Sequence, residues 1–368
     1  MPDRIIALCR PGFEKECAAE LQHHAAQLGH SCYIKTSADS GYVELVFNGY
    51  GQTGAPQQYM EDVAFSSLIF CRQWFCGDGM LDDIDEVDRL GPMLARIDSM
   101  GMHFSRIEFN WPDTNEGKSI SRFCKQFQPH LERALKKRGA LKRTASQSLQ
   151  CLWLNSCNVF IGSAANDNAS GVPMGIMHLR MPSEAPSRST LKLEEAIAWF
   201  IDDEDMRQFI KAGMRAVDLG AAPGGWSWQL ARHGMLVNAV DNGPMDERLM
   251  ADGMVDHTRA DAFHWRPDSA VDWLVCDMVE RPLHVTRLIA DWFVKRLCHY
   301  SIFNLKLPMN KRFQAVCDCL QLLNRTLEEA GIRHELYAKH LYHDREEITV
   351  FCRRLPAQDP LMMKDHER

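Results

Sequence analysis

One lysine interrupts an apolar strand pattern in the C-terminal half of the chain. Residues 302–308 read Ile-Phe-Asn-Leu-Lys-Leu-Pro, and Lys306 is the only charged residue among them. Burying an ammonium group is costly, so lysine rarely occupies such a position for structural reasons alone. Because burial and a neighbouring cation can depress the pKa of a lysine, this residue type can act as a general base. The pattern indicates a chemical role for Lys306.

Acidic residues end two other apolar runs. Asp277 follows the sequence Trp-Leu-Val-Cys, and Asp241 follows residues 237–240. The carboxyl ends of parallel strands meet at one edge of a sheet, where α/β proteins bind their ligands. We therefore expect Asp277 to lie beside the reacting groups and Asp241 to accept hydrogen bonds from the two hydroxyls of a ribose. An aspartate at a strand end can also serve only as a helix cap, and this alternative stays open for Asp241.

A glycine-rich turn precedes Asp241. Residues 215–226 read Arg-Ala-Val-Asp-Leu-Gly-Ala-Ala-Pro-Gly-Gly-Trp, an apolar strand that runs into a turn and then a helical pattern. This order places backbone N–H groups and a helix N-terminus around a nucleotide-like ligand. A dinucleotide site requires Gly-x-Gly-x-x-Gly, whereas the second position after Gly220 is Ala222, which Pro223 follows. The turn therefore favours a nucleoside cofactor without a pyrophosphate.

The string Asp-Leu-Gly-Ala-Ala-Pro-Gly-Gly-Trp resembles the first motif of the class I S-adenosylmethionine-dependent methyltransferases, in the branch that methylates ribose 2′-hydroxyls of RNA. Residues 187–195 resemble the Ser-Arg-x-x-x-Lys-Leu entry of the same branch, and Asp261 lies where that family contacts adenine. The resemblance implies S-adenosylmethionine as the cofactor. The residues that it assigns to cofactor binding are Ser189, Ala222, Pro223, Gly224, Gly225, Asp241, Asp261 and Asp277.

This family also carries a Lys-Asp-Lys-Glu tetrad. The resemblance assigns Lys192, Asp277 and Lys306 to its first three members, with Lys306 as the general base that removes the proton of the ribose hydroxyl. The neighbouring cation that would depress the pKa of the base is Lys192. In this scheme Asp277 orients Lys306.

The fourth tetrad member falls within residues 343–350, His-Asp-Arg-Glu-Glu-Ile-Thr-Val. A strand period of two groups Glu346 with Ile348 and Val350, so Glu346 is the preferred match, and it would hold Lys192. Glu347 remains the alternative.

Two other residue sets are expected to have no part in catalysis. His340, His343 and Asp344 could suggest a metal site, but transfer of a sulfonium methyl group needs no metal, so we expect them to pack at a strand edge. The thirteen cysteines include no Cys-x-x-Cys pair, and we expect reduced, mostly buried thiols.

The C-terminal half must position these residues. Strand patterns at 216–219, 236–241, 271–276 and 302–307 alternate with helical patterns at 226–233, 283–300 and 311–330, and two strands close the chain. This alternation predicts an α/β domain with a doubly wound, mostly parallel sheet. The resemblance implies a Rossmann-like methyltransferase domain over residues 182–368, with an antiparallel last strand.

The N-terminal half is predicted to be α+β. Its strand patterns lie at 4–9, 42–47, 106–111 and 151–161, and its helical patterns lie at 13–24, 92–100 and the segment after 111. Residues 8–21 resemble the opening of proteins that carry a ferredoxin-like module followed by a THUMP domain, which is an RNA-binding unit. We therefore expect a ferredoxin-like subdomain over 1–85 and a THUMP-like domain over 86–181.

Charge is distributed unevenly. The chain carries a net charge of −7, which argues against indiscriminate binding to nucleic acid, yet residues 118–143 hold nine basic residues and one acid. Apolar residues recur through this segment at helical spacing, so one face is apolar and the other basic, with Pro129 a candidate kink or break. The basic face is either solvated or binds RNA phosphates, and we favour the second reading.

The remaining expectations concern location and partners. No apolar run is long enough to span a membrane, and residues 1–16 are charged where a signal peptide needs an apolar core. We expect a cytoplasmic monomer without a membrane partner. The whole chain resembles methyltransferases of 23S ribosomal RNA, which implies that RNA or its precursor as the partner and a cytidine as the target.

Two alternative functions are a 2′-O-methyltransferase of another RNA and a non-catalytic assembly factor that binds ribosomal RNA. A non-catalytic relative would be expected to lose tetrad members, and all four positions are filled here. Methylation of an exocyclic nitrogen would need an Asn/Asp-Pro-Pro-Tyr-like loop, but Met278 and Val279 follow Asp277.

Overall fold

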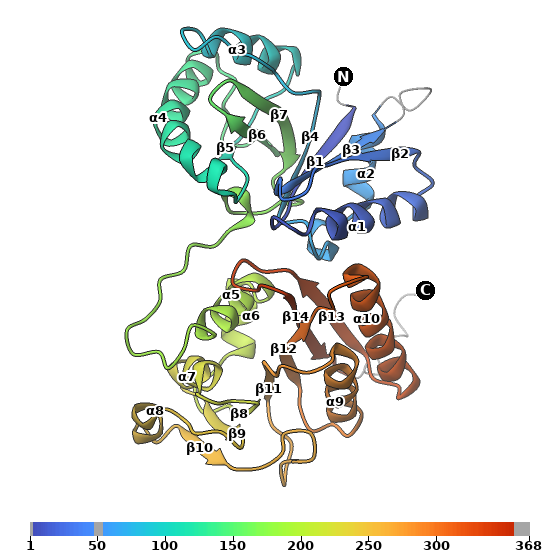
Figure 1. Cartoon of the computed structure of the whole chain (residues 1–368), viewed down its shortest axis with the longest axis vertical. Coiled ribbons are helices and arrows are strands. Elements are labelled where there is room, and N and C mark those ends of the chain that lie inside the picture. The colour runs from blue at the N-terminus through green and yellow to red at the C-terminus, as the bar shows by residue number, and fades with distance from the viewer. Residues whose placement is uncertain (1–2, 48–53, 357–368) are drawn as a thin grey trace, which may run out of the picture. The chain divides into compact units, whose positions relative to one another are not determined.

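The computed structural model describes residues 3–47 and 54–356. The chain divides into two compact units, Met1–Met177 and His178–Arg368 (Figure 1). Each unit is built around its own seven-stranded sheet. The expected subdomain over 1–85 lies in the first unit, and so does the expected domain over 86–181 as far as Met177. Pairing of β4 with β7 joins their strands in one sheet.

The first unit has the strand order β2-β3-β1-β4-β7-β6-β5. Its main elements are β1 (Arg4–Leu8), α1 (Glu14–Gln27), β2 (Cys32–Lys35), β3 (Tyr42–Phe47), α2 (Ala55–Asp62), β4 (Gln73–Gly77), α3 (Leu90–Ser99), β5 (Ile107–Asn110), α4 (Asn115–Lys137), β6 (Gln147–Asn155) and β7 (Asn158–Ala165). Among these strands only the β5–β6 pair is parallel. This mixture of strands and helices confirms the predicted α+β class for the N-terminal half.

One strand prediction in this unit was wrong. Residues 151–161 belong to two strands, β6 and β7, which form an antiparallel hairpin around Ser156 and Cys157. The side-chain amide oxygen of Asn155, Oδ1, accepts a hydrogen bond from the Cys157 backbone N–H at 2.8 Å and closes the turn. Neither turn residue is glycine, so the commonest hairpin signal is absent from the sequence.

The basic segment forms one long helix. Thr114 caps the start of α4 by accepting a hydrogen bond from the Gly117 N–H, and the helix continues through Pro129 without a break. Its apolar face buries Ile120, Leu131 and Leu135 against the sheet. The opposite face is left to the basic side chains, as the helical spacing predicts.

The second unit has the strand order β10-β9-β8-β11-β12-β14-β13. Its elements are α5 (Thr190–Phe200), α6 (Asp203–Phe209), β8 (Arg215–Leu219), α7 (Gly225–Arg232), β9 (Leu236–Val240), α8 (Glu247–Ala251), β10 (Val255–Thr258), β11 (Trp273–Cys276), α9 (Pro282–Val294), β12 (Tyr300–Lys306), α10 (Arg312–Glu329), β13 (His334–Lys339) and β14 (Glu347–Arg354). Only β14 runs antiparallel to its neighbours, β12 and β13. The doubly wound, mostly parallel sheet with an antiparallel last strand is confirmed.

Helices cover both faces of this sheet. On one face, Leu193 of α5 and Trp226 of α7 pack in a buried cluster with Trp273 and Phe351 of the sheet. Helices α9 and α10 pack against each other, α9 against β12 and α10 against β13 (Figure 1). The central strands are buried on both sides, so their carboxyl ends are held at one rigid edge.

Two sequence expectations can be compared with side-chain environments. Every cysteine is a free thiol, and only Cys32, Cys157 and Cys317 are partly exposed. Among the described residues, no helix is long and apolar enough to cross a membrane.

Candidate active site

Four charged side chains meet at the carboxyl edge of the second sheet. Asp277 follows the last residue of β11, and Lys306 is the last residue of β12, its parallel neighbour. Glu347 opens the antiparallel strand β14 directly opposite Lys306. Lys192 reaches the same edge from the first turn of α5. Parallel strands end together, so the sheet itself brings these distant residues into one site.

The two lysines and the two carboxylates alternate. The Lys192 Nζ lies 3.0 Å from Oδ2 of Asp277 and 2.5 Å from Oε1 of Glu347. The Lys306 Nζ contacts Oε2 of Glu347 and lies 3.6 Å from Oδ1 of Asp277. Each carboxylate therefore contacts both lysine side chains. We call Lys192, Asp277, Lys306 and Glu347 the charged tetrad.

The structure corrects the preference for Glu346 over Glu347. The Glu346 side chain is 63% exposed and pairs with Arg312 at 2.6 Å, whereas the Glu347 side chain is 4% exposed between the two lysines. The alternation argument failed because β14 is buried on both faces from Glu347 to Cys352. A strand with two buried faces has no polar face, so the period of two cannot show which glutamate points inward.

The division of roles between the carboxylates also differs from the expected scheme. The expected scheme pairs Asp277 with Lys306, but the Asp277 carboxylate lies closer to Lys192. Burial disfavours the charge of Lys192, yet the carboxylates of Asp277 and Glu347 outweigh that effect and raise the pKa of Lys192. Lys192 is therefore held as a cation beside Lys306.

A chain of buried polar side chains, missed in the sequence, supports Asp277 from behind. Asn304 of β12 donates from Nδ2 to Oδ1 of Asp277 at 2.9 Å. The Thr349 hydroxyl lies 2.8 Å from Oδ1 of Asn304 and 3.0 Å from Oδ2 of Asp344. Burial, with the charges of Glu347 and Glu195, raises the pKa of Asp344 well above its usual value.

The number of available protons fixes the direction of the hydrogen bond between Thr349 and Asn304. A threonine hydroxyl has one proton, and Oδ1 of Asn304 can only accept, so Thr349 donates to Asn304. The same hydroxyl lies within hydrogen-bond distance of both carboxyl oxygens of Asp344. The resulting chain runs from Asp344 through Thr349 and Asn304 to Asp277. Alternation along β12, which places Asn304 and Lys306 on one face, is the sequence signal that could have shown Asn304.

Glu195 is a second residue that the sequence did not reveal. It lies one turn after Lys192 on α5, is 1% exposed, and accepts hydrogen bonds from the backbone N–H groups of Tyr342 and His343, each at 2.9 Å. It also contacts Nδ1 of His343 at 2.6 Å. Glu195 thereby fixes the loop before β14. Within the described part of the chain, no group of three or more His, Cys, Asp and Glu side chains is arranged to hold a metal ion.

The glycine-rich turn connects β8 to α7 at the same edge. Gly220 has φ 77° and Gly224 has φ 113°, values that L side chains rarely adopt. A β-carbon on Gly225 would collide with the hydroxyl groups of Ser187 and Ser189. Because Gly224 is the N-cap of α7, no side chain caps that helix. The first N–H groups of α7 are therefore presented at the sheet edge, where they can bind an anionic ligand group.

The remaining expected cofactor residues lie around this turn with different surroundings. Asp241, which follows β9, accepts hydrogen bonds from the N–H groups of Ala222 at 3.0 Å and Gly243 at 2.6 Å. Asp241 therefore stabilises the glycine-rich turn and also lies at the carboxyl edge of the sheet. Ser189 is the N-cap residue of α5, and its carbonyl oxygen accepts from Nε1 of Trp226.

Asp261 lies in the loop after β10 and belongs to a more open environment. Its side chain is 55% exposed. It accepts hydrogen bonds from the N–H of Phe263 and contacts Nδ1 of His264, which together lower the pKa of Asp261. The carboxylate is therefore ionised and able to accept further hydrogen bonds from a ligand.

Asp218, in strand β8 just before the turn, has a carboxyl group with a shifted pKa. It is 1% exposed and accepts a hydrogen bond from the Ser227 hydroxyl at 2.7 Å. Burial raises the pKa of Asp218 to about 7, although the hydrogen bond from Ser227 opposes the shift. The sequence shows Asp218 only as the acid between the apolar strand and the turn.

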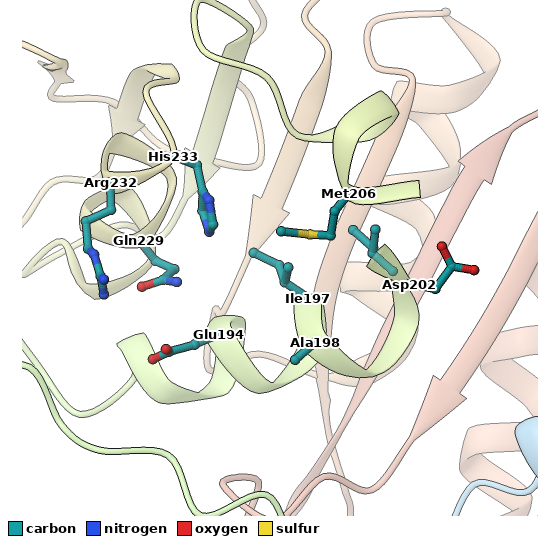
Figure 2. Close-up of a pocket in the computed structure, with 9 residues that line it drawn as sticks. Glu194, Ile197, Ala198, Asp202, Met206, Gln229, Arg232 and His233 are labelled. Atoms are coloured by element: carbon teal, nitrogen blue, oxygen red, sulfur yellow. The ribbon is translucent and has the colours of Figure 1, made fainter. Parts of the chain in front are cut away.

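A separate cavity of about 640 Å³ lies between α5, α6 and α7 (Figure 2). Glu194 and Ile197 of α5 line it together with Gln229 of α7. No member of the charged tetrad lines it, and the Lys192 side chain of α5 extends instead to Asp277. This cavity is therefore separate from the charged tetrad.

The sheet order, the glycine-rich turn and the charged tetrad define an α/β methyltransferase. In agreement, the profile of the FtsJ-like methyltransferase family matches residues 185–322. Two further profiles match the first unit, the RlmM ferredoxin-like domain over residues 1–75 and the N-terminal domain of ribosomal RNA large subunit methyltransferase M over residues 88–165.

Curated relatives resemble the chain over nearly its whole length. Proteins named "Ribosomal RNA large subunit methyltransferase M" from Pseudoalteromonas translucida (strain TAC 125) and Cellvibrio japonicus (strain Ueda107) are 44% and 45% identical to it. These alignments cover 94% and 95% of this chain and 96% and 99% of the relatives. The chain therefore belongs to the ribosomal RNA large subunit methyltransferase M family.

Proposed function

We propose that this methyltransferase transfers a methyl group from S-adenosylmethionine to the 2′-hydroxyl of a ribose in 23S ribosomal RNA, at a cytidine. The observation that carries this proposal is the charged tetrad, in which a lysine at a sheet edge contacts two carboxylates beside a second, cationic lysine. The relatives are named for ribosomal RNA of the large subunit, which supports this RNA as the substrate.

The residues of the second unit fit the cofactor. The uncapped N-terminus of α7 suits its carboxylate, and Asp241 lies at the end of β9, where an acid accepts hydrogen bonds from ribose hydroxyls. Ser189, Ala222, Pro223, Gly224 and Gly225 would surround its methionine part, and Asp261 would bind the adenine amino group. When bound, the cofactor supplies an electrophilic methyl group on a sulfonium centre.

The chain's own residues would align the ribose and move one proton. A ribose hydroxyl is a weak nucleophile, so its proton must be removed as the oxygen–carbon bond forms. Lys306, entering the step as the free amine, accepts that proton at Nζ. Asp277 and Glu347 orient Lys306, and Lys192 keeps a positive charge beside it. Positioned base catalysis contributes about 10² to 10⁴-fold, and alignment adds to it.

Helix α4 is proposed to bind the RNA, as part of a THUMP-like module. Its six basic side chains are all exposed, and three of them, Arg122, Lys125 and Lys137, form no ion pair with a carboxylate in the described structure. Unpaired cations along one helix face suit a phosphate backbone. Because all four tetrad residues come from one unit, we propose that a single chain carries out the reaction, in the cytoplasm.

The central experiment is methyl transfer to 23S ribosomal RNA isolated from cells that lack the enzyme, with mapping of the methylated nucleotide. K306M should reduce the rate by 10² or more while the cofactor still binds. K306R is the decisive variant, because arginine keeps the positive charge but cannot act as a base near neutral pH. Full activity of K306R would show that Lys306 serves only as a cation.

RNA binding by α4 is tested with a triple charge reversal of Lys136, Lys137 and Arg138 to Glu. Affinity for the RNA should fall, and the slope of log affinity against log salt should flatten by about 0.7 to 0.9 per lost phosphate contact. Cofactor affinity, measured by calorimetry, should stay at the parent value because the cofactor residues lie in the other unit. Equal RNA binding by the triple variant and the parent at several salt concentrations would show that α4 is only a solvated face.

A further inference from the structure

A second, strongly basic cavity lies at the edge of the methyltransferase sheet opposite the charged tetrad. It has a volume of about 1030 Å³ and lies where β12 begins and β14 ends, since Tyr300 and Arg354 both line it. The charged tetrad lies at the other ends of the same two strands, at Lys306 and Glu347. Seven residue steps along β14, at about 3.3 Å each, separate the two sites by roughly 23 Å.

Cations from four separate segments converge on this cavity. Lys211 follows α6, Arg296 follows α9, Arg333 precedes β13 and Arg354 ends β14. Arg353 also lines the cavity, and the carboxylate of Asp205 pairs with it at 3.2 Å. We call Lys211, Arg296, Arg333 and Arg354 the basic quartet.

The basic quartet is not neutralised within the part of the chain that the structure describes. Arg333 donates to the carbonyl oxygen of Pro356, and Arg354 contacts the imidazole of His299. For the quartet as a whole, no ion pair with a carboxylate occurs among residues 3–47 and 54–356. Four cations that line one cavity without carboxylate partners create a local positive field.

One nitrogen of Arg354 lacks an acceptor within the described part of the chain. The Nη1 atom of Arg354 is buried and has no hydrogen-bond partner among the described residues. Its other terminal nitrogen, Nη2, lies 3.0 Å from Nδ1 of His299. Burial and Arg354 lower the pKa of His299, so the imidazole adds no charge. A buried guanidinium nitrogen without an acceptor favours an anionic ligand.

Arg296 supports the same reading from the backbone. It follows the C-cap of α9 with φ 56°, a left-handed conformation that glycine or asparagine usually takes after a helix. An arginine at this position costs about 1 kcal/mol or more of backbone strain. Its side chain nevertheless lines the cavity.

We propose that the basic quartet binds the phosphate backbone of the RNA substrate at a second site, on the edge of the methyltransferase sheet away from the reaction. The number of cations favours a strand of RNA over a single phosphate, because each phosphodiester carries one charge and the four cations are spread over a large cavity. This inference rests on the proposed function, because the RNA that the basic quartet binds is the RNA that the enzyme methylates.

The test compares two triple variants of the full chain with the same loss of charge. The cavity variant carries K211Q, R296Q and R333Q, all at exposed side chains, and leaves the partly buried Arg354 in place. The matched control carries R207Q, K295Q and R325Q, which are exposed cations of the same unit that do not line the cavity. Affinity for protein-free 23S ribosomal RNA is measured at several salt concentrations, and cofactor affinity serves as the check on folding.

The cavity variant should bind RNA about five- to eightfold more weakly per lost contact at 0.1 M salt, with a salt slope flatter by about 0.7 to 0.9 per contact. The control variant should bind like the parent. If both variants bind RNA alike, the second site is overturned. Methyl transfer by the parent is read separately: a parent that fails to methylate the RNA, while the cavity variant still loses affinity, overturns the proposed function and retains the site.

Discussion

Replacing Glu347 with glutamine should damage this enzyme far more than the same change at Glu346. Glu347 is the only tetrad member whose side chain is almost fully buried, at 4% exposed, and it contacts both lysines. E347Q keeps the size of the side chain and removes its charge. The two ammonium groups of Lys192 and Lys306 would then share the single carboxylate of Asp277.

The expected loss of stability follows from the burial of the partners. Breaking a buried ion pair from one side costs about 3 to 5 kcal/mol, because a buried charge is left uncompensated. Lys192 and Lys306 are 16% and 26% exposed, so water relieves part of that cost. We expect E347Q to lower the free energy of unfolding by about 2 to 3 kcal/mol.

The loss of catalytic rate in E347Q should be larger, relative to the parent, than its loss of stability. Without Glu347, the Nζ of Lys306 retains only the 3.6 Å contact with Asp277, so the proposed base is poorly oriented. Misplacing a general base forfeits much of its contribution, which is about 10² to 10⁴-fold. The methyl transfer rate of E347Q should therefore fall at least about tenfold with saturating cofactor and RNA.

The assay pairs urea unfolding with methyl transfer, and E346Q is the control. Glu346 is 63% exposed and its ion pair with Arg312 is at the surface, so E346Q should change the free energy of unfolding by at most about 1 kcal/mol. If E347Q and E346Q unfold alike and methylate RNA at the same rate, the reasoning from the charged tetrad is wrong. Loss of activity in E346Q alone would restore Glu346 as the fourth tetrad residue.

Three further predictions concern residues around the tetrad. D241A should weaken cofactor binding about tenfold or more by calorimetry, because it removes a hydrogen-bond acceptor worth about 1 to 3 kcal/mol. D202A, which removes an exposed helix cap, should leave the cofactor affinity unchanged, and equal affinities of the two variants would place the ribose contact elsewhere. T349V should lower kcat several-fold without changing cofactor affinity, since it breaks the hydrogen-bond chain to Asp277. T286V, which removes another buried threonine hydroxyl, should leave kcat unchanged, and equal kcat values of the two variants would refute the role of the chain. Burial raises the pKa of Asp218 to about 7 from its unfolded value of 3.8, so its contribution to stability is complete below pH 4 and is lost as pH rises through 7. The free energy of unfolding of D218N should therefore equal that of the parent at pH 4 and exceed it by up to about 4 kcal/mol at pH 8. Parallel curves of unfolding free energy against pH for the two proteins would contradict this prediction.

The sequence by itself determined the class of the second unit and the positions of three tetrad residues. Lys306 and Asp277 could be found because each stands out against an apolar run, and a parallel sheet necessarily brings the ends of such runs to one edge. The glycine-rich turn was equally visible, because only glycine adopts the backbone angles of Gly220 and Gly224 without strain. Lys192 carried no such local signal and was found through the family resemblance alone.

Only the tertiary structure decided which glutamate completes the charged tetrad and what supports it. Glu347 faces Lys306 because of the pairing register between β12 and β14, and a strand buried on both faces leaves no polar alternation from which that register can be read. The chain from Asp344 to Asp277 and the basic quartet join residues that are far apart in the sequence. Their energies depend on distances and burial that exist only once the sheet has formed, so no local pattern of residues encodes them.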